Sequence, residues 1–203
     1  MELAALRAGA LRILGRDLAD TEADSFDKYL NLLIKWQKVH RLVGSSEPSW
    51  IIDRIFLDSL LFLRALPSGA RRILDVGSGA GVPGLPLKLV IPDLHLTMVE
   101  SRQRRASFLS TVVRELSLRD VRVIPRRLES MVREDADHFD AIVARCAGDV
   151  GYLFGLGAHL VQRGGMVIAS GLPEEHQLPV GAWVTVPGVK PGETRRFAVY
   201  RRE

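Results

Sequence analysis

The chain has 203 residues, of which 47% are hydrophobic and 26% are charged, a composition typical of one globular domain and unlike that of disordered, collagen-like or disulfide-rich chains. A single cysteine, Cys146, excludes an intramolecular disulfide and a cysteine-based metal site, and no apolar stretch approaches the ~20 residues of a spanning helix. The net charge of +4 permits a polyanionic partner without requiring one. We therefore expect a cytoplasmic protein that has no metal site and does not enter a membrane.

Residues 1–66 are expected to form an N-terminal helical extension. Apolar side chains recur every three or four positions over residues 20–41, which predicts an amphipathic helix, and a shorter helix is expected over residues 3–14. The same period returns over residues 50–63 and ends at a turn that contains Pro and Gly. Residues 67–203 then form the second predicted domain.

The second domain alternates between strand-like and helical segments. Short apolar, strand-like segments occupy residues 72–76, 95–99, 121–124, 139–144 and 166–169. Helical segments lie between them at residues 85–90, 103–116 and 150–162. This alternation predicts a doubly wound, Rossmann-like α/β fold with a parallel sheet. Two last strand-like segments, 183–186 and 197–200, flank a region rich in Pro and Gly and predict a C-terminal antiparallel hairpin.

The turn after the first strand is the predicted site of a nucleotide-like ligand, because ligands of doubly wound sheets bind beyond the carboxyl ends of the strands. The turn contains Gly77, Ser78, Gly79 and Gly81. Glycines let the backbone pass close to a ligand. Asp75 precedes the turn, and Glu100 at the end of the second strand is placed to accept hydrogen bonds from ribose hydroxyls.

A nicotinamide-dependent oxidoreductase is the distant alternative at this turn. Gly79-x-Gly81-x-x-Gly84 has the spacing of a dinucleotide fingerprint. That fingerprint should begin at the strand end, which is Gly77, and the third glycine would then fall on Val82. A carboxylate at the strand end also disfavours a pyrophosphate, whereas it suits the ammonium and sulfonium groups of S-adenosylmethionine.

Several motifs of the chain resemble those of the RsmG (GidB) family, bacterial enzymes that methylate N7 of a guanine in 16S ribosomal RNA with S-adenosylmethionine. The motifs are DVGSGAGVPGLPL at 75–87, VES at 99–101, RxxFL at 105–109, LxxW at 33–36 and LDSL at 57–60. The resemblance extends over nearly the whole chain. It implies a class I methyltransferase fold in the second domain, S-adenosylmethionine as cofactor, and 16S ribosomal RNA or the 30S subunit as partner of a monomer.

The resemblance also implies roles for individual residues. It gives the methionine end of the cofactor to Asp75, Gly77 and Gly79, the ribose to Glu100 and Ser101, and the adenine to the backbone of Leu128 and Glu129. Ser78, Gly81 and Arg145 complete the expected cofactor site.

Four positions depart from the family's usual residues. The chain has Gln37 and Arg41 where the family usually has asparagines, Ile55 in place of a histidine, and Ser170 in place of a lysine. All four are expected on the RNA side and none in the glycine turn. The departures therefore leave the cofactor prediction unchanged and the methylated nucleotide open.

The expected chemistry needs no general base, because N7 of guanine carries a free lone pair and catalysis can come from alignment with the sulfonium. Arg145, at the end of the fourth strand, is the predicted catalytic residue, well placed for a phosphate or a guanine edge. Cys146 beside it offers an alternative, since carbon-5 methylation of cytosine needs a thiolate that Arg145 could stabilise. No proline precedes Cys146, so we favour a packed, inert thiol.

Arginines outside the turn are the predicted RNA contacts. Basic pairs occur at Arg126 and Arg127 and at Arg195 and Arg196, and such pairs are suited to the RNA backbone. A cofactor-binding paralogue without activity on ribosomal RNA remains a further alternative.

Overall fold

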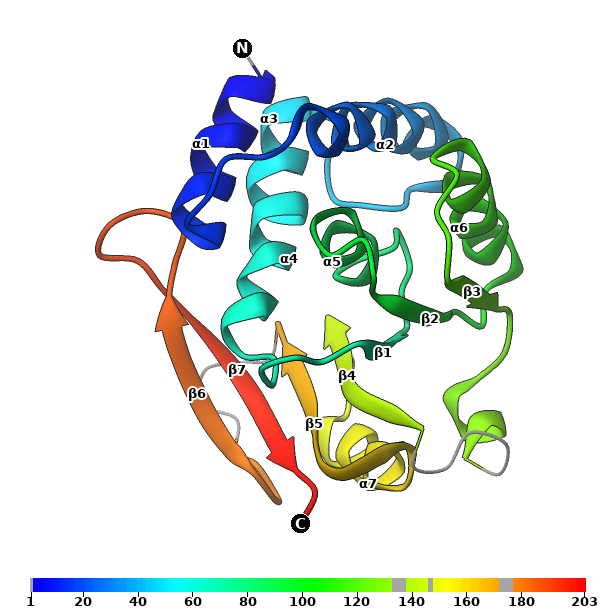
Figure 1. Cartoon of the computed structure of the whole chain (residues 1–203). Coiled ribbons are helices and arrows are strands. Elements are labelled where there is room, and N and C mark those ends of the chain that lie inside the picture. The colour runs from blue at the N-terminus through cyan, green and yellow to red at the C-terminus, as the bar shows by residue number, and fades with distance from the viewer. Residues whose placement is uncertain (1, 133–137, 146–147, 172–176) are drawn as a thin grey trace.

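The computed structural model describes residues 2–132, 138–145, 148–171 and 177–203 (Figure 1). This part of the chain contains a seven-stranded sheet with the strand order β3-β2-β1-β4-β5-β7-β6. The strands are β1 (Arg72–Val76), β2 (His95–Val99), β3 (Val121–Ile124), β4 (Phe139–Arg145), β5 (Val161–Ser170), β6 (Ala182–Pro187) and β7 (Thr194–Arg201). β1 to β5 pair in parallel, and β7 pairs antiparallel with both β5 and β6. The doubly wound sheet and the C-terminal hairpin are therefore confirmed.

The register of the central strands brings their carboxyl ends to one edge of the sheet. Val76 at the end of β1 pairs with Val99 of β2 on one side and with Ala144 of β4 on the other. The turns that follow these three strands therefore lie next to one another, which is the usual ligand position in such a sheet.

Helices cover both faces of the sheet (Figure 1). The helices of the second half of the chain are α5 (Gly84–Val90), α6 (Gln103–Glu115), the short 3₁₀-helix η3 (Leu128–Met131) and α7 (Val150–Leu160). α5 and α6 share one hydrophobic cluster with Ile73 and Val143, whereas α7 shares a second cluster with Leu74 and Ile142. Neighbouring residues of β1 and β4 thus enter opposite layers, as the alternation of side chains along a strand requires.

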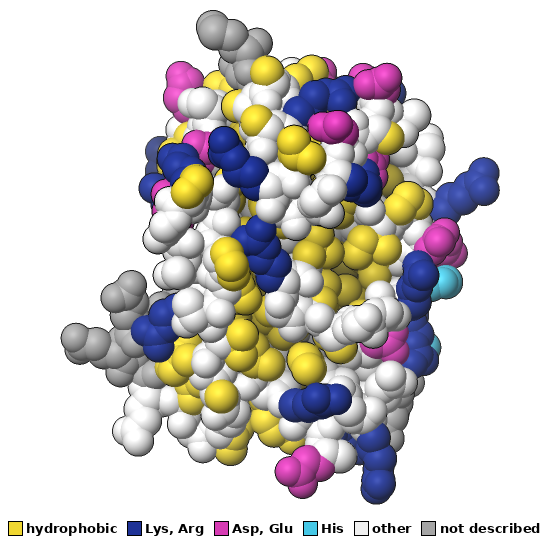
Figure 2. All heavy atoms as spheres, turned by 60° about the vertical axis from the view of Figure 1, so that its left-hand side comes forward, with side chains coloured by type: hydrophobic (Ala, Val, Ile, Leu, Met, Phe, Trp, Pro, Cys, Tyr) yellow, Lys and Arg dark blue, Asp and Glu magenta, His cyan; other side chains and the backbone are white. Residues whose placement is uncertain are grey.

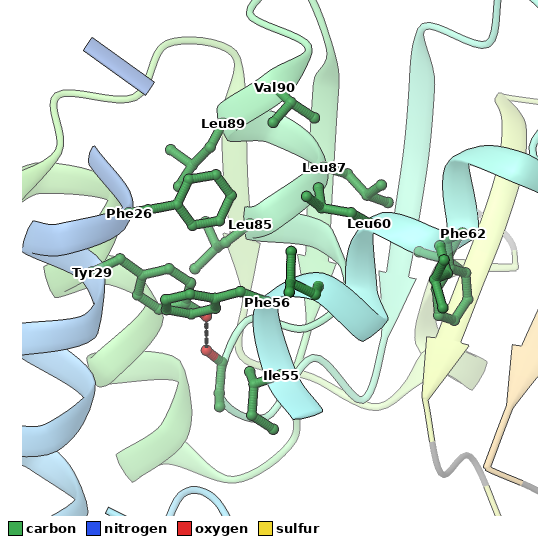
Figure 3. Packing of buried hydrophobic residues seen from close by; sticks show 14 of the residues in the cluster. Phe26, Tyr29, Ile55, Phe56, Leu60, Phe62, Leu85, Leu87, Leu89 and Val90 are labelled. Carbon is green, nitrogen blue, oxygen red and sulfur yellow. Dashed lines mark hydrogen bonds between the residues drawn. The ribbon is translucent and has the colours of Figure 1, made fainter. Parts of the chain in front are cut away.

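The N-terminal helices join the first of these layers. They are α1 (Glu2–Leu14), α2 (Asp20–His40), α3 (Pro48–Ile51), the π-helix η1 (Ile52–Leu57), α4 (Asp58–Leu60) and the 3₁₀-helix η2 (Leu61–Arg64). The ring centroids of Phe26 and Tyr29 lie 5.2 and 5.0 Å from that of Phe56, and these rings pack over Leu85 of α5 (Figure 3). The extension and the sheet therefore bury one common core.

The largest differences from the sequence prediction concern the junction of α7 with β5 and the helix over residues 50–63, while the other boundaries agree to within three residues. The helix predicted over residues 150–162 ends at Leu160, and Val161 begins β5 because it pairs with Phe139 ahead of a shift in the strand register. The helix predicted over residues 50–63 is divided into α, π and 3₁₀ turns. Within the described residues, no helix is long and apolar enough to span a membrane.

Candidate active site

The glycine turn after β1 is fixed to the end of β2. The amides of Gly77 and Ser78 donate to the carbonyl oxygen of Val99 at 2.8 and 3.2 Å. The φ angles of Gly77, Gly79 and Gly81 are +67°, +56° and +91°, values that other residues rarely adopt. The shape of the turn therefore depends on glycine at these positions.

Helix α2 holds the same turn from outside the sheet. The buried hydroxyl of Tyr29 donates to the carbonyl oxygen of Ala80 at 2.5 Å (Figure 3). Burial, and to a lesser degree the charge of Asp75, raises the pKa of Tyr29 well above its usual value. A Cβ atom on Gly81 would lie 2.2 Å from Leu85 Cδ1 and 3.0 Å from the Tyr29 hydroxyl oxygen. The packing of α2 and α5 therefore leaves no room for a side chain here.

Asp75 closes the turn onto α5. Its side chain is fully buried, and Oδ2 accepts a hydrogen bond from the Gly84 amide at 2.9 Å. Oδ1 has no hydrogen-bond partner among the residues that the structure describes. Burial raises the pKa of Asp75 to about 7, and the charge of Glu100 adds to the shift. The carboxyl group therefore faces the first turn of α5.

Glu100, directly after β2, is hydrogen-bonded to the glycine turn. Only 4% of the residue is exposed. Oε2 accepts a hydrogen bond from the Gly79 amide at 3.0 Å, and Oε1 accepts one from the Arg102 amide at 2.8 Å. A single carboxylate thus links the glycine turn to the start of α6.

A hollow of about 210 Å³, which we call the β1–β2 hollow, opens beyond the carboxyl ends of these two strands. The predicted site residues that line it are Gly77, Glu100, Ser101, Arg126, Arg127, Leu128 and Glu129. Val76, Val99, Asp149, Tyr152 and Leu153, which the sequence analysis missed, also line it. Asp75, Ser78, Gly79, Gly81 and Arg145 do not line it.

The far wall of the β1–β2 hollow is built on the first turn of α7. Asp149 caps this helix by accepting a hydrogen bond from the Tyr152 amide at 3.0 Å. The Tyr152 hydroxyl donates to Glu129 Oε1 at 2.6 Å, which lowers the pKa of Glu129 and raises that of Tyr152. An aspartate directly before a helical segment is a capping signal, so Asp149 could have been found from the sequence.

The residues around the β1–β2 hollow fit part of a nucleoside cofactor. Val99 and Leu128 offer apolar walls, Glu100 offers a carboxylate, and a Cβ built on Gly77 would meet nothing within 4 Å. The volume is below the roughly 300–1,000 Å³ of typical ligand pockets. A ligand larger than this hollow would therefore extend beyond it.

Arg145 does not line this hollow, and its side chain instead contacts the N-terminal helices. Its Nη2 atom donates to the carbonyl oxygen of Arg54 at 2.5 Å and lies 3.4 Å from Asp58 Oδ2. Asp58 and Arg195 line a second hollow of about 340 Å³ between η1 and the start of β7, which we call the η1–β7 hollow. The sequence analysis named the LDSL segment at 57–60 but gave Asp58 no role.

The four arginines predicted to contact RNA lie in three places. Arg126 and Arg127 line the β1–β2 hollow, and Arg195 lines the η1–β7 hollow. The guanidinium of Arg196 lies 4.5 Å from the centre of the Trp183 ring. On the face that carries β6 and β7, basic side chains are interspersed with hydrophobic ones (Figure 2).

The structure shows the contacts or the conformation of the four residues that depart from the family pattern. Gln37 hydrogen-bonds both the amide and the carbonyl oxygen of Val43. Ile55 is buried, and Ser170 pairs with Arg145 across β5 and β4. Arg41 ends α2 in a left-handed conformation.

Cys146 lies outside the described residues, and among those that are described no group of three His, Cys, Asp or Glu side chains could hold a metal ion.

Comparisons with known proteins identify the family of the chain. The family described as "GidB: rRNA small subunit methyltransferase G" matches residues 22–177. Two relatives named ribosomal RNA small subunit methyltransferase G are each 36% identical to this chain. The relative from Methylobacillus flagellatus aligns over 78% of this chain and 76% of its own length. The relative from Nitrosospira multiformis aligns over 92% of this chain and 80% of its own length. The solved structure of cofactor-bound Rv0187 from MTB shares the fold, with a TM-score of 0.58, 15% identity and coverage of 87% of this chain and 88% of the other. The chain therefore belongs to the GidB family, that of rRNA small subunit methyltransferase G.

Proposed function

We propose that this protein transfers a methyl group from S-adenosylmethionine to N7 of a guanine in 16S ribosomal RNA, acting as a monomer in the cytoplasm. The observation that carries the proposal is the β1–β2 hollow, in which Glu100 and Gly77 face the space beyond the glycine turn. The names of the relatives support a ribosomal RNA substrate. The substrate is naked RNA or the 30S particle.

Residues around the hollow account for the cofactor. Glu100 would accept hydrogen bonds from the ribose hydroxyls, with Ser101 beside it, since both residues line the hollow. The backbone of Leu128 and Glu129, which also line it, would hold the adenine. Gly77 and Gly79 would leave room for the methionine end. Asp75 is fully buried and does not line the hollow, and its Oδ1 atom, which has no partner in the described part of the chain, would be the group available to that end. When bound, S-adenosylmethionine supplies the electrophilic methyl group of its sulfonium.

The protein's contribution to the reaction is alignment. The lone pair of guanine N7 attacks without losing a proton, so no side chain has to act as a base. Arg145 holds the base or its phosphate at the carboxyl end of β4, because a guanidinium donates to guanine O6 and to phosphate oxygens. The walls of the site keep the reacting atoms in line, which by itself supplies a large part of a rate enhancement.

Transfer of a labelled methyl group tests the proposal. Wild-type protein is given S-adenosylmethionine with either 30S particles or naked 16S ribosomal RNA that lacks the modification, and the product is digested for nucleoside mass spectrometry. We expect 7-methylguanosine, and we expect Arg145→Ala to lower kcat more than RNA affinity. Arg114→Ala, which removes an exposed arginine of α6, is the matched control. Transfer to cytosine carbon 5, or no transfer to either substrate, would refute the assignment.

A further inference from the structure

The carboxylate of Asp58 forms ion pairs with two arginines, Arg145 and Arg195, at the carboxyl edge of the sheet. Asp58 Oδ2 accepts a hydrogen bond from Arg195 Nη2 at 3.2 Å and lies 3.4 Å from Arg145 Nη2. Asp58 Oδ1 lies 3.1 Å from Arg195 Nε. The side chains of Asp58 and Arg145 are each 18% exposed, and that of Arg195 is 28% exposed. These contacts are largely shielded from water, so they are stronger and less screened than surface ion pairs.

The cluster retains hydrogen-bonding capacity for a ligand. Two guanidinium groups and one carboxylate leave one positive charge uncompensated within the cluster. Arg145 Nη1 is buried and has no hydrogen-bond partner among the residues described. Guanidinium groups present their donors in a fixed plane that matches phosphate and guanine acceptors. The cluster is thus suited to an anionic or acceptor-rich ligand.

The cluster borders the η1–β7 hollow, and its Arg145, which lines neither hollow, is next in sequence to a strand residue that pairs with a residue of the β1–β2 hollow. Arg145 follows Ala144, which pairs with Val76, a residue of the β1–β2 hollow. Asp58 and Arg195 line the η1–β7 hollow. The π-helical turn η1 forms one wall of this second hollow and supplies the Arg54 carbonyl oxygen that Arg145 contacts. Turns of this kind occur often at functional sites.

We propose that Asp58 is a positioning residue that holds Arg145 and Arg195 as a paired clamp on the target nucleotide, which enters the η1–β7 hollow. The inference rests on the proposed function and adds the place where the RNA nucleotide binds. Asp58 itself touches neither cofactor nor base. It fixes the directions of the guanidinium donors, so that the base meets them already ordered.

Asp58→Asn tests the clamp because it keeps the size of the side chain and removes the charge that orients both arginines. We expect kcat to fall by about tenfold to a hundredfold, the range that a misplacement of about 1 Å can produce. Affinity for a 16S transcript should be unchanged or tighter, because the variant carries one negative charge fewer. Affinity for S-adenosylmethionine, measured by calorimetry, should be unchanged and reports an intact fold. Asp58→Glu, which restores the carboxylate, should recover part of kcat.

Asp20→Asn is the matched control, since Asp20 also pairs with an arginine, Arg7 Nη2 at 2.8 Å, but at the start of α2. We expect it to leave kcat unchanged. A further variant combines Asp58→Asn with Arg195→Gln, and its loss of kcat should be smaller than the product of the two single losses, because both changes break the same clamp. Wild-type kcat in Asp58→Asn, or independent effects in the double variant, would overturn the inference.

The wild-type protein separates this test from that of the proposed function. If the wild-type protein methylates no RNA, the proposed function fails. The clamp is then tested only by the affinity of the protein for the 16S transcript. Arg195→Gln should then lower the slope of log affinity for the transcript against log salt by about one, whereas Asp58→Asn should not lower it. An unchanged slope in Arg195→Gln would overturn the clamp.

Discussion

Replacing Asp75 with Asn should remove a pH dependence of stability that this residue creates. Asp75 is fully buried, and burial raises its pKa to about 7 from 3.8. Between these two values the folded protein keeps a proton that the unfolded chain has lost. The free energy of unfolding therefore falls as the pH rises from about 4 to about 7, and it is level above the folded pKa.

The size of the effect follows from the two pKa values. Each factor of ten in proton affinity corresponds to about 1.4 kcal/mol. From pH 5 to pH 8 the wild-type protein should therefore lose about 3 kcal/mol of unfolding free energy relative to Asp75→Asn. The asparagine keeps an acceptor for the Gly84 amide but cannot ionise. Because other titrating groups act equally in both proteins, the difference isolates Asp75.

Urea denaturation at several pH values measures this difference. Asp140→Asn is the control, because hydrogen bonds from the Arg71 and Arg72 amides and the Arg72 guanidinium outweigh burial and lower the pKa of Asp140. Its contribution is present above the ordinary pKa of an aspartate and is lost only as the pH falls through the lowered value. Wild-type protein and Asp140→Asn should therefore run parallel from pH 5 to pH 8. Parallel curves for wild-type protein and Asp75→Asn would refute the reasoning.

Three other predictions concern Glu100, Tyr152 and Cys146. Glu100→Ala should weaken S-adenosylmethionine binding by about 1–3 kcal/mol, the scale of hydrogen bonds to a charged acceptor, and the wild-type protein should not bind NAD. Calorimetry measures both. Full S-adenosylmethionine affinity in the variant, or micromolar NAD binding by the wild-type protein, would contradict the prediction. Tyr152→Phe should raise the pKa of Glu129 toward its ordinary value, since the hydroxyl that lowers it is gone; an NMR titration with no change would show that the bond is absent in solution. Cys146→Ala should keep methyl transfer, whereas a carbon-5 mechanism would lose about a thousandfold or more in rate.

Much of the fold follows from local pattern. The buried strands are short apolar segments, and the motif at 75–87 marks the turn at the end of β1. The start of β5 at Val161 was missed because the local sequence continues the period of α7, while its pairing with Phe139 is a contact between distant segments. The π-helical form of η1 was missed as well, since π-turns are rare and the apolar spacing over residues 50–63 predicts a helix without distinguishing its type.

The candidate site was less predictable than the fold. Glu100 follows from its place after β2. The direction of the Asp75 side chain, toward α5, depends on the register of β1 in the sheet. The cluster of Asp58, Arg145 and Arg195 joins three segments that are distant in sequence. No local spacing encodes such a contact, so only the folded chain reveals it.

The hydrogen bond from Tyr29 to Ala80 couples the stability of the glycine turn to that of α2. A ligand that orders the glycine turn should therefore also stabilise α2, whose Tyr29 lies 51 residues before Ala80 in the chain. Protection of the α2 amides from hydrogen exchange should therefore rise when S-adenosylmethionine is present, even though no residue of α2 lines the β1–β2 hollow. The same linkage acts in reverse: a chain that begins after α2 should bind S-adenosylmethionine more weakly, because it lacks the Tyr29 hydroxyl that holds the turn.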